Sequence, residues 1–237
     1  MKTLIVDAMN IFVRSYVVVP SMSEHGHHVG GTLGFMKSLG SYSRRFSPNR
    51  IIVVWEGGGS PRRRALLKEY KGNRKPVRLN RSDIYEDIPD SQENFNYQVA
   101  ATTKLLTHTS VEQMYVSDCE ADDVIGTVTN IASKLKINSI IISGDKDLAQ
   151  LVTEDTVVVD PMRRDGAPAK ILDENGVLEK FGVPPAKIID FLTLLGDAVD
   201  NIPGVPKVGP KTAKKWLEKK GYDSMDGPIN FGERDKW

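Results

Sequence analysis

The chain has very little cysteine and histidine and no long hydrophobic run. A single cysteine, Cys119, excludes an internal disulfide and is compatible with a reducing cytoplasm. No apolar run approaches the roughly 18 residues of a membrane-spanning helix, and the opening MKTLIVDAMN carries an acid inside its only apolar stretch, unlike a signal peptide. The four histidines (His25, His27, His28 and His108) lie away from every acidic motif, which disfavours zinc. We therefore expect a cytoplasmic protein that does not contact a membrane.

Net charge is also almost absent, at +1 for 237 residues. This value alone neither indicates nor excludes a nucleic-acid partner, but acids and bases are segregated along the chain. Hydrophobic residues make up 40% and charged residues 27%, as in a soluble globular protein. The length is sufficient for one large domain or one and a half ordinary ones.

Short β-rich runs alternate with helix-length segments, which predicts an α/β protein with a parallel sheet. The expected strands are 3–7, 51–56, 113–116, 138–143 and 156–160. The expected helices are 31–46, 91–108, 120–135, a short one from Asp145, 173–182, 184–196 and 209–221. We place a soft boundary near residue 160, which divides a core of 1–160 from a helical region of 161–237 that ends in a loosely held tail.

Carboxylates follow the apolar runs of four expected strands and one later apolar stretch. The nine acids are Asp7, Glu56, Glu120, Asp122, Asp123, Asp145, Asp147, Asp197 and Asp200. Because ligands of parallel α/β sheets bind outside the carboxyl ends of the strands, these acids should converge. They would repel one another unless cations hold them together, and oxygen ligands suit Mg²⁺ or Mn²⁺. Two such ions can clamp the attacking and leaving oxygens of a phosphodiester.

Each acidic group has a simpler interpretation when it is taken singly. Ser117-x-x-Glu120 fits a capping box, and acids in a first helical turn favour the helix dipole. Asp145 could likewise cap a short helix. Capping does not explain acids on five elements together, so the metal site is the favoured hypothesis.

Positive charge is concentrated in the segment 60–90, directly after Glu56 and three glycines. Its basic residues up to position 81 are Arg62, Arg63, Arg64, Lys68, Lys71, Arg74, Lys75, Arg78 and Arg81, with Glu69 as the only acid among them. Such a segment could cover the acidic site and attract phosphates, and Tyr70 within it could stack on an exposed base. The alternative is a solvated loop with surplus charge.

Near the C-terminus, GVPKVGPKTAKKW (204–216) joins a glycine-bearing turn to a basic helix. Backbone N–H groups at a helix N-terminus bind phosphate oxygens without regard to base sequence. The alternative is an ordinary turn before an amphipathic helix.

Five stretches together resemble the 5′ nuclease family: flap endonucleases, phage 5′-3′ exonucleases and the 5′ nuclease domain of bacterial DNA polymerase I. They are LIVDAMN, EYKGNR, CEADDVIG, ISGDKDLAQLV and LLGDAVDNIPGVPKVGPKTA, from residue 4 to about 217, in the family's order and spacing. The resemblance implies a PIN-like (resolvase-like) nuclease core, with the segment 60–90 as a basic arch, and a C-terminal helix-three-turn-helix module that grips duplex DNA. It further implies a monomeric enzyme of DNA replication or repair in a bacterial or phage-infected cell, acting on DNA with 5′ flaps or free 5′ ends.

The resemblance also implies roles for individual residues. The first-ion group would be Asp7, Glu56, Glu120 and Asp122, and the second Asp123, Asp145, Asp147, Asp197 and Asp200, with Mg²⁺ as the ion and Mn²⁺ as a substitute. The catalytic set would be Lys71, Arg74, Asp145 and Asp147, with the two cations on the scissile phosphate. Tyr70 would stack on the terminal nucleotide, and the other DNA contacts would be Arg62, Arg63, Arg64, Lys68, Gly204, Val205, Gly209, Lys211, Lys214 and Lys215. In relatives, carbonyls of the C-terminal turn can hold a monovalent cation such as K⁺.

Two features depart from the family's pattern. Position 56 is glutamate where aspartate is usual, and the chain ends soon after the basic helix. Two other interpretations stay open at this point: a non-catalytic relative that binds DNA structures, and a PIN-type ribonuclease. The balance between exonucleolytic and flap-endonucleolytic cleavage, and the removal of RNA primers, are also open.

Overall fold

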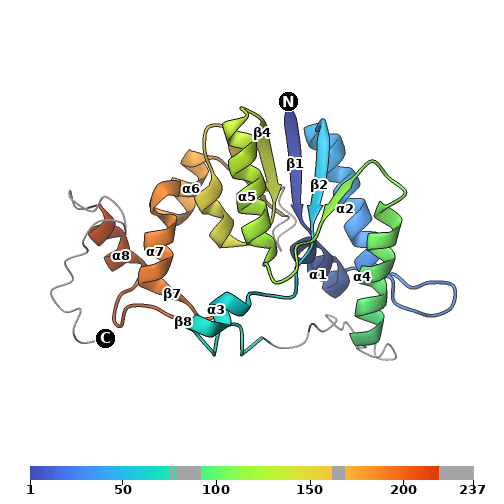
Figure 1. The fold of residues 1–237 in the computed structure, drawn as a ribbon, viewed down its shortest axis with the longest axis horizontal. Helices are drawn as coiled ribbons and strands as arrows, with labels where there is room; N and C mark the ends of the chain where they lie inside the picture. Colours follow the sequence, from blue (N-terminus) through green and yellow to red (C-terminus); the bar gives the residue numbers. More distant parts are fainter. Residues whose placement is uncertain (75–76, 78–91, 162–168, 219–237) are drawn as a thin grey trace.

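The structure is a computed structural model that describes residues 1–74, 77, 92–161 and 169–218. Figure 1 shows a central sheet with helices on both sides and the C-terminal helices at one end. Lys75, Arg78 and Arg81, most of the segment 75–91 and the expected tail lie outside the described residues.

A six-stranded sheet forms the centre of the molecule. Its strands are β1 (Lys2–Asp7), β2 (Arg50–Val54), β3 (Glu112–Met114), β4 (Asn138–Ile142), β5 (Thr156–Asp160) and β6 (Lys170–Leu172), in the order β3-β2-β1-β4-β5-β6. The first five are parallel, as predicted. Strand β6 was not expected and runs antiparallel to β5. It lies beyond the boundary placed near residue 160, which stays a prediction.

The strand order determines where a ligand can bind. Strands β2 and β3 follow β1 on one side of it, and β4 then pairs with β1 on its other side. The point at which strand order reverses therefore lies between β1 and β4, where parallel α/β sheets bind ligands at the carboxyl ends. Val6 is paired with Ile142, so Asp7 lies beside the start of the loop 143–145.

Alternation along the strands gives the sheet two hydrophobic faces. On one face, strand residues that include Ile5 and Ile141 pack against four elements: α5 (Ala121–Lys134), the 3₁₀ helix η2 (Lys146–Leu151), α7 (Ile188–Leu195) and α8 (Pro210–Leu217). On the other face, strand residues that include Leu4 and Ile140 pack against α1 (Ala8–Val18), α2 (Gly30–Phe46) and α4 (Gln92–Leu106). Among the described residues, no helix has the length and apolar character that crossing a bilayer requires.

Two helices were not expected from the sequence. Helix α1 follows β1 without a loop, because the Asp7 carboxylate accepts the Asn10 N–H at 3.1 Å and caps the first turn. Helix α3 (Pro61–Leu66) opens the basic segment, capped by Ser60. Both starts carry a capping residue in the sequence, Asp7 for α1 and Ser60 before Pro61 for α3, but Asp7 also ends a strand and α3 is only six residues long.

The C-terminal helices pack as part of the core. After α6 (Glu174–Phe181) and the 3₁₀ turn η3 (Pro185–Lys187), helix α7 leads into a hairpin of β7 (Gly196–Asp197) and β8 (Ile202–Pro203), and then into α8. Ala213 and Leu217 of α8 are buried in the same cluster as Ile5. Gly204 follows the hairpin, where a Cβ atom would lie 2.2 Å from the Leu195 carbonyl oxygen. The predicted α/β core with a helical C-terminal region is confirmed.

The burial of strand β4 can be tested by replacing one of its core residues. Replacing Ile141, which is fully buried, with alanine should lower the free energy of unfolding by about 2–5 kcal/mol, because it removes core contacts and leaves a cavity. The matched control is Ile131→Ala on α5, where the side chain is 53% exposed and the change should stay within about 0.5 kcal/mol. Urea denaturation of both variants measures the difference, and equal losses would contradict this placement of Ile141.

Candidate active site

Asp7 lies at the reversal point of the sheet and joins two loops. It is 7% exposed, and its Oδ2 accepts the Ser143 hydroxyl at 2.8 Å. The Ser143 hydroxyl oxygen in turn accepts the Asp145 N–H at 3.0 Å, and the Asn10 side-chain oxygen accepts the Gly144 N–H at 3.0 Å. The loops after β1 and β4 are thus hydrogen-bonded to each other. The sequence reasoning did not single out Asn10 and Ser143. Ser143 directly follows β4, Asn10 lies one helical turn after Asp7, and both fall within the stretches LIVDAMN and ISGDKDLAQLV.

Four aspartates at this end of the sheet repel one another, and we call Asp7, Asp122, Asp145 and Asp147 the acidic cluster. Burial, followed by repulsion from Asp145 and Asp7, raises the pKa of Asp122 to about 8. Burial and the charges of Asp145 and Glu56 raise the pKa of Asp7 to about 6, against hydrogen bonds from Ser143 and Asn10. Burial and the Asp145 charge raise the pKa of Asp147 to about 6. The cluster therefore favours either protons or added cations.

Glu56 and Glu120 lie beside the cluster. The Glu56 Oε2 accepts the Ala121 N–H at 3.3 Å, at the start of α5. Gly57 permits this approach, because a Cβ there would lie 1.8 Å from the Val116 carbonyl oxygen. Glu120 is 3% exposed, and among the described residues its buried Oε1 has no hydrogen-bond partner.

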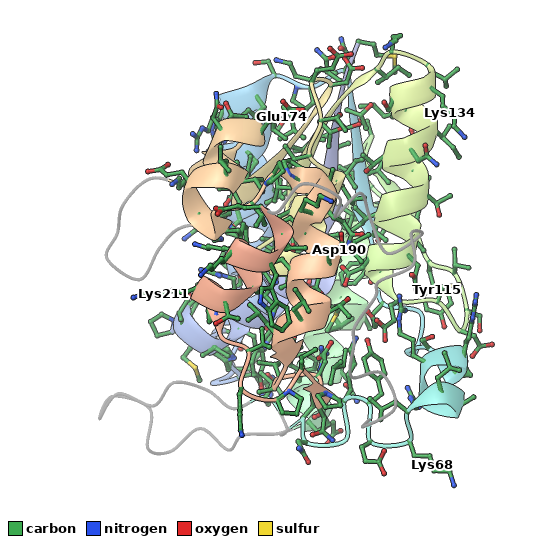
Figure 2. The ribbon with its side chains drawn as sticks, turned by 90° about the vertical axis from the view of Figure 1, so that its left-hand side faces the viewer. Lys68, Tyr115, Lys134, Glu174, Asp190 and Lys211 are labelled. Atoms are coloured by element: carbon green, nitrogen blue, oxygen red, sulfur yellow. The ribbon has the colours of Figure 1, made fainter. Side chains whose placement is uncertain are left out.

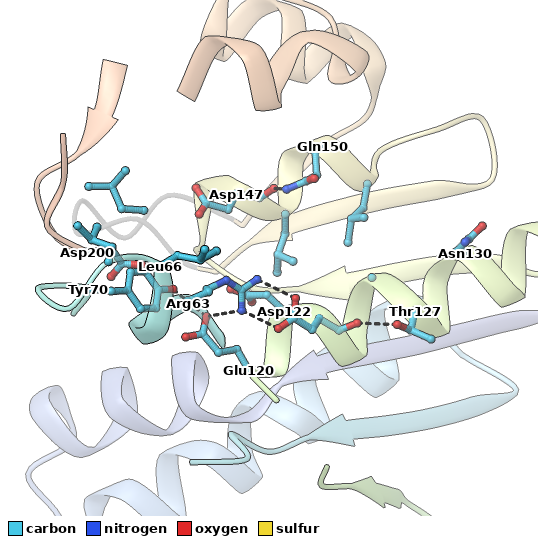
Figure 3. A pocket seen from close by; sticks show the side chains of 16 residues that line it. Arg63, Leu66, Tyr70, Glu120, Asp122, Thr127, Asn130, Asp147, Gln150 and Asp200 are labelled. Atoms are coloured by element: carbon cyan, nitrogen blue, oxygen red, sulfur yellow. Dashed lines mark hydrogen bonds and ion pairs between the residues drawn. The ribbon is translucent and has the colours of Figure 1, made fainter. Parts of the chain in front are cut away.

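Basic side chains neutralise the acids around the cluster (Figure 3). The Glu120 Oε2 accepts the Tyr70 hydroxyl at 2.9 Å and lies 2.9 Å from the Lys71 Nζ and 3.3 Å from the Arg63 guanidinium. The Arg74 guanidinium donates to the Asp200 carboxylate at 2.7 Å. The start of the basic segment thus contacts the acidic site.

A second acid, Asp197, pairs with Lys146 of η2 at 3.0 Å. Burial opposes ionisation of Asp197, but hydrogen bonds from Lys146 and the Val199 N–H outweigh burial and lower its pKa. Lys146 stands between Asp145 and Asp147 in the sequence and was not singled out there.

Backbone contacts attach residues 69–74 to the β7–β8 hairpin. The Lys71 N–H donates to the Asp200 carbonyl at 2.9 Å, and the Asn201 side chain donates to the Glu69 carbonyl at 3.1 Å. Asn73 donates to the Asn201 side-chain oxygen at 3.2 Å. Together with α3, α5 and η2, these segments line an open pocket of about 640 Å³ (Figure 3). The acids Glu120, Asp122, Asp123, Asp147 and Asp200 and the cation Arg63 line it.

Most predicted site residues gather here, although two have partners that the sequence did not suggest. Both Asp123 oxygens accept hydrogen bonds from Arg63. Tyr70 is 8% exposed, with Lys71 Nζ 5.1 Å from its ring centroid. Stacking of Tyr70 on a nucleotide stays a prediction and would require its ring to become exposed. Arg62, Arg64 and Lys68 are exposed, and Lys68 projects from the molecule in Figure 2.

The acids have the ligand type and the negative charge that divalent ions require, although their oxygens do not lie in the positions of a complete ligand shell. Within the ranges that the structure describes, no three His, Cys, Asp or Glu side chains are placed to hold a metal ion. The donor set is nevertheless all carboxylate, the ligand type that Mg²⁺ and Mn²⁺ prefer. The partnerless Glu120 Oε1 and the raised pKa values of Asp7, Asp122 and Asp147 are the properties that a bound dication would offset.

The predicted DNA-binding turn forms a separate feature around the start of α8. The Val205 N–H donates to the Leu194 carbonyl at 2.9 Å, and Gly209 precedes the helix. Lys211 and Lys215 are exposed. Lys214 lies instead against Gly182, where a Cβ atom would be 2.3 Å from its Nζ.

Comparison with known proteins agrees with this geometry. Residues 2–182 match the model of the N-terminal resolvase-like domain of 5′-3′ exonucleases, and residues 183–231 match the model of their C-terminal SAM fold. The chain belongs to the 5′-3′ exonuclease family. This family of nucleases includes the 5′-3′ exonuclease of Aquifex aeolicus, which is 32% identical over 236 residues covering 99% of this chain and 74% of that protein.

Other members of the family are much longer. DNA polymerase I of Pseudomonas aeruginosa is 35% identical over 230 residues, and the match covers 94% of this chain but 23% of that protein. Among solved structures, the T5 D15 flap endonuclease in a pseudo-enzyme–product complex with DNA and metal ions has a TM-score of 0.71 and 21% identity, covering 92% of this chain and 74% of that one. At that identity the likeness concerns the fold.

The acidic cluster predicts how stability depends on pH when divalent ions are chelated. Aspartates titrate near 3.9 in an unfolded chain, whereas the pKa of Asp122 is about 8 in the folded one, so the folded state binds more protons between these values. The free energy of unfolding should therefore decrease as pH rises from about 4 to about 8, by on the order of 2 kcal/mol.

Asp122→Asn should weaken this dependence, because it removes the group with the highest folded-state pKa in the cluster. Asp118→Asn, on the exposed loop before α5, is the control and should leave the dependence as in the wild type. Urea titrations in EDTA at several pH values provide the measurement. A stability that increases over this range would contradict the electrostatic description.

Proposed function

We propose that this chain is a structure-specific 5′ nuclease that hydrolyses DNA phosphodiesters near 5′ ends with two divalent ions, Mg²⁺ in the first instance. The observation that supports this most is the meeting of the acidic cluster, at the reversal point of the sheet, with the cations of residues 63–74. Acids alone would suit a metal store, and cations alone would suit an anion site. Side by side, they suit a phosphodiester bound to metal.

We assign the ions to carboxylates in the pocket and at the adjoining carboxyl ends of β1 and β4. Asp7, Glu56, Glu120 and Asp122 would hold one, and Asp123, Asp145, Asp147, Asp197 and Asp200 the other, with Mn²⁺ as a substitute. When bound, the pair would lower the pKa of a coordinated water and neutralise charge on the leaving 3′ oxygen. Glu56 is one methylene longer than aspartate, and its contact with the Ala121 N–H shows that it reaches the start of α5.

The basic residues would bind and orient the substrate. Lys71 and Arg74 neutralise Glu120 and Asp200 here, and the same ammonium and guanidinium can pair with a phosphate at this site. Exposed Lys211 and Lys215 would contact the backbone of the duplex, independently of base sequence. K⁺ at the turn before α8, a monomeric state and a cytoplasmic location stay predictions.

The two rival functions are less well supported. A non-catalytic DNA-binding relative would be expected to have lost part of the site, yet all nine predicted acids are present. A ribonuclease with the same core remains an alternative that cleavage of matched RNA and DNA substrates distinguishes. The balance of exonuclease and flap-endonuclease activity requires the same kind of assay.

The paired replacement Asp145→Asn with Asp147→Asn tests the metal mechanism. It should reduce Mg²⁺-dependent cleavage of a 5′-flap DNA by at least about 100-fold, because it removes two negative charges from the cluster. The control is Glu154→Gln, a neutral replacement of a carboxylate whose side chain is 83% exposed. Gel analysis of a 5′-labelled flap measures the rate, and unchanged cleavage by the double variant would refute the mechanism.

Binding of DNA should depend on salt through α8. Lys211→Ala should reduce the slope of log affinity against log salt by about 1, because one phosphate contact is lost. Lys134→Ala on α5 is the matched control, since its exposed side chain lies far from Lys211 in Figure 2. Fluorescence anisotropy in Ca²⁺ or EDTA measures binding without cleavage, and equal slopes for the two variants would contradict the placement of DNA at α8.

A further inference from the structure

Asn201 is the last residue of the β7–β8 hairpin loop and has a left-handed backbone conformation, with a φ of 59°. Asparagine tolerates this conformation better than most residues, which by itself would explain an asparagine at this place. Its side chain, however, also contacts a distant segment. The Asn201 Nδ2 donates to the Glu69 carbonyl at 3.1 Å, and its Oδ1 accepts from the Asn73 side chain at 3.2 Å. A loop that required only backbone freedom would not require these contacts.

The segment that Asn201 contacts, which we call the basic turn (residues 69–74), has an unfavourable backbone conformation of its own. Lys71 has a φ of 56°, which residues with a Cβ atom rarely adopt. Its N–H donates to the Asp200 carbonyl at 2.9 Å, and the Arg74 N–H donates to the Lys71 carbonyl at 3.3 Å. The hairpin therefore stabilises the turn that carries the Lys71 and Arg74 side chains.

The contacts between the hairpin and the backbone of the basic turn involve no carboxylate oxygen. The Asn201 side chain bonds a carbonyl and another amide, and Asp200 accepts from the Lys71 N–H through its carbonyl oxygen. The ion pairs of Arg74 with Asp200 and of Lys71 with Glu120 instead involve carboxylates that the proposed ions would bind. The neutral contacts are therefore compatible with bound ions, whereas these ion pairs would be rearranged.

The hairpin also packs closely where it leads into the turn before α8. A Cβ atom at Gly196 would lie 2.2 Å from the Gly204 nitrogen, and the Val205 N–H donates to the Leu194 carbonyl at 2.9 Å. Figure 1 shows β7 and β8 between α3 on one side and α7 and α8 on the other. One short hairpin thus connects the basic turn with the helix that would contact duplex DNA.

We infer that Asn201 is a positioning residue that attaches the basic turn to the β7–β8 hairpin and so holds Lys71 and Arg74 beside Glu120 and Asp200. In this role it acts through the two cations and not through a contact of its own with the substrate. Its effect on cleavage rests on the proposed nuclease function. The attachment itself does not.

Asn201→Gly separates the side chain from the backbone, because glycine adopts the left-handed conformation readily. Hydrogen–deuterium exchange of peptides covering 69–74 should be roughly three- to tenfold faster in this variant, as expected when neutral hydrogen bonds are lost. Lys136→Gly is the matched control and should leave this exchange unchanged. Lys136 also has a φ of 56°, its side chain is 76% exposed, and it lies in the loop before β4, at the opposite end of the sheet.

Asn73→Ala tests the partner of Asn201. It should speed exchange of the basic turn less than Asn201→Gly does, because it removes one of the two side-chain contacts. Since Asn201→Gly already breaks that contact, the double variant should exchange no faster than Asn201→Gly alone.

Steady-state cleavage of a 5′-flap DNA in Mg²⁺ separates positioning from binding. In Asn201→Gly, kcat should fall roughly tenfold, because Lys71 and Arg74 are no longer held in place. The KM should stay within about twofold, since the exposed lysines of α8 are unchanged. The melting temperature should stay within about 3 °C of the wild type, because the lost contacts are at the surface.

Unchanged exchange of the basic turn in Asn201→Gly, or faster exchange still in the double variant, would overturn the attachment. A kcat within twofold of the wild type, or a change in KM alone, would overturn the positioning role. If the wild type does not cleave DNA in Mg²⁺, the proposed function fails, while the exchange measurements still decide on the attachment.

Discussion

Repulsion among carboxylates at the carboxyl ends of β1 and β4 is the constraint on which the rest of the site depends. The fold places β4 beside β1, and this brings Asp7, Asp145 and Asp147 to one edge together with Asp122 of α5. Burial intensifies the repulsion, because less water screens the charges. Other residues of the site supply positive charge or hydrogen bonds that offset this concentration of acid.

Three parts of the chain provide this compensation in different ways. Ser143 and the Asn10 N–H donate to Asp7 within the sheet edge itself. Lys146 neutralises Asp197 from η2. The segment 63–74 adds the basic side chains that contact Glu120 and Asp200, and it is attached by backbone hydrogen bonds to the β7–β8 hairpin. A cationic segment that contacts the acids in this way is also well placed to meet a phosphate that approaches them.

The sequence allowed much of the fold and most of the site to be predicted. Short apolar runs such as NSIII and TVVVD identify strands because their side chains must be buried away from water. Acids that follow such runs identify the edge of a parallel sheet at which ligands bind. Helices α1 and α3 and strand β6 were not predicted. Helix α1 buries Ala8, Ile11, Phe12, Ser15 and Tyr16 at helical spacing, but it follows the strand directly, without a turn signal between them. An exposed six-residue helix and a three-residue edge strand are too short to show a periodicity of their own.

By itself, the sequence determined the chemical nature of the site, since the kinds of side chain and their order along the chain decide which ligands are available. Only the tertiary structure decided which charges are partners. Arg63 pairs with Asp123 and Arg74 with Asp200, across separations of 60 and 126 residues. Such pairs depend on how α3 and the hairpin pack against α5 and η2. An ion pair forms only when its charged groups lie within a few ångströms of each other. No pattern in the sequence determines that distance for segments so far apart along the chain.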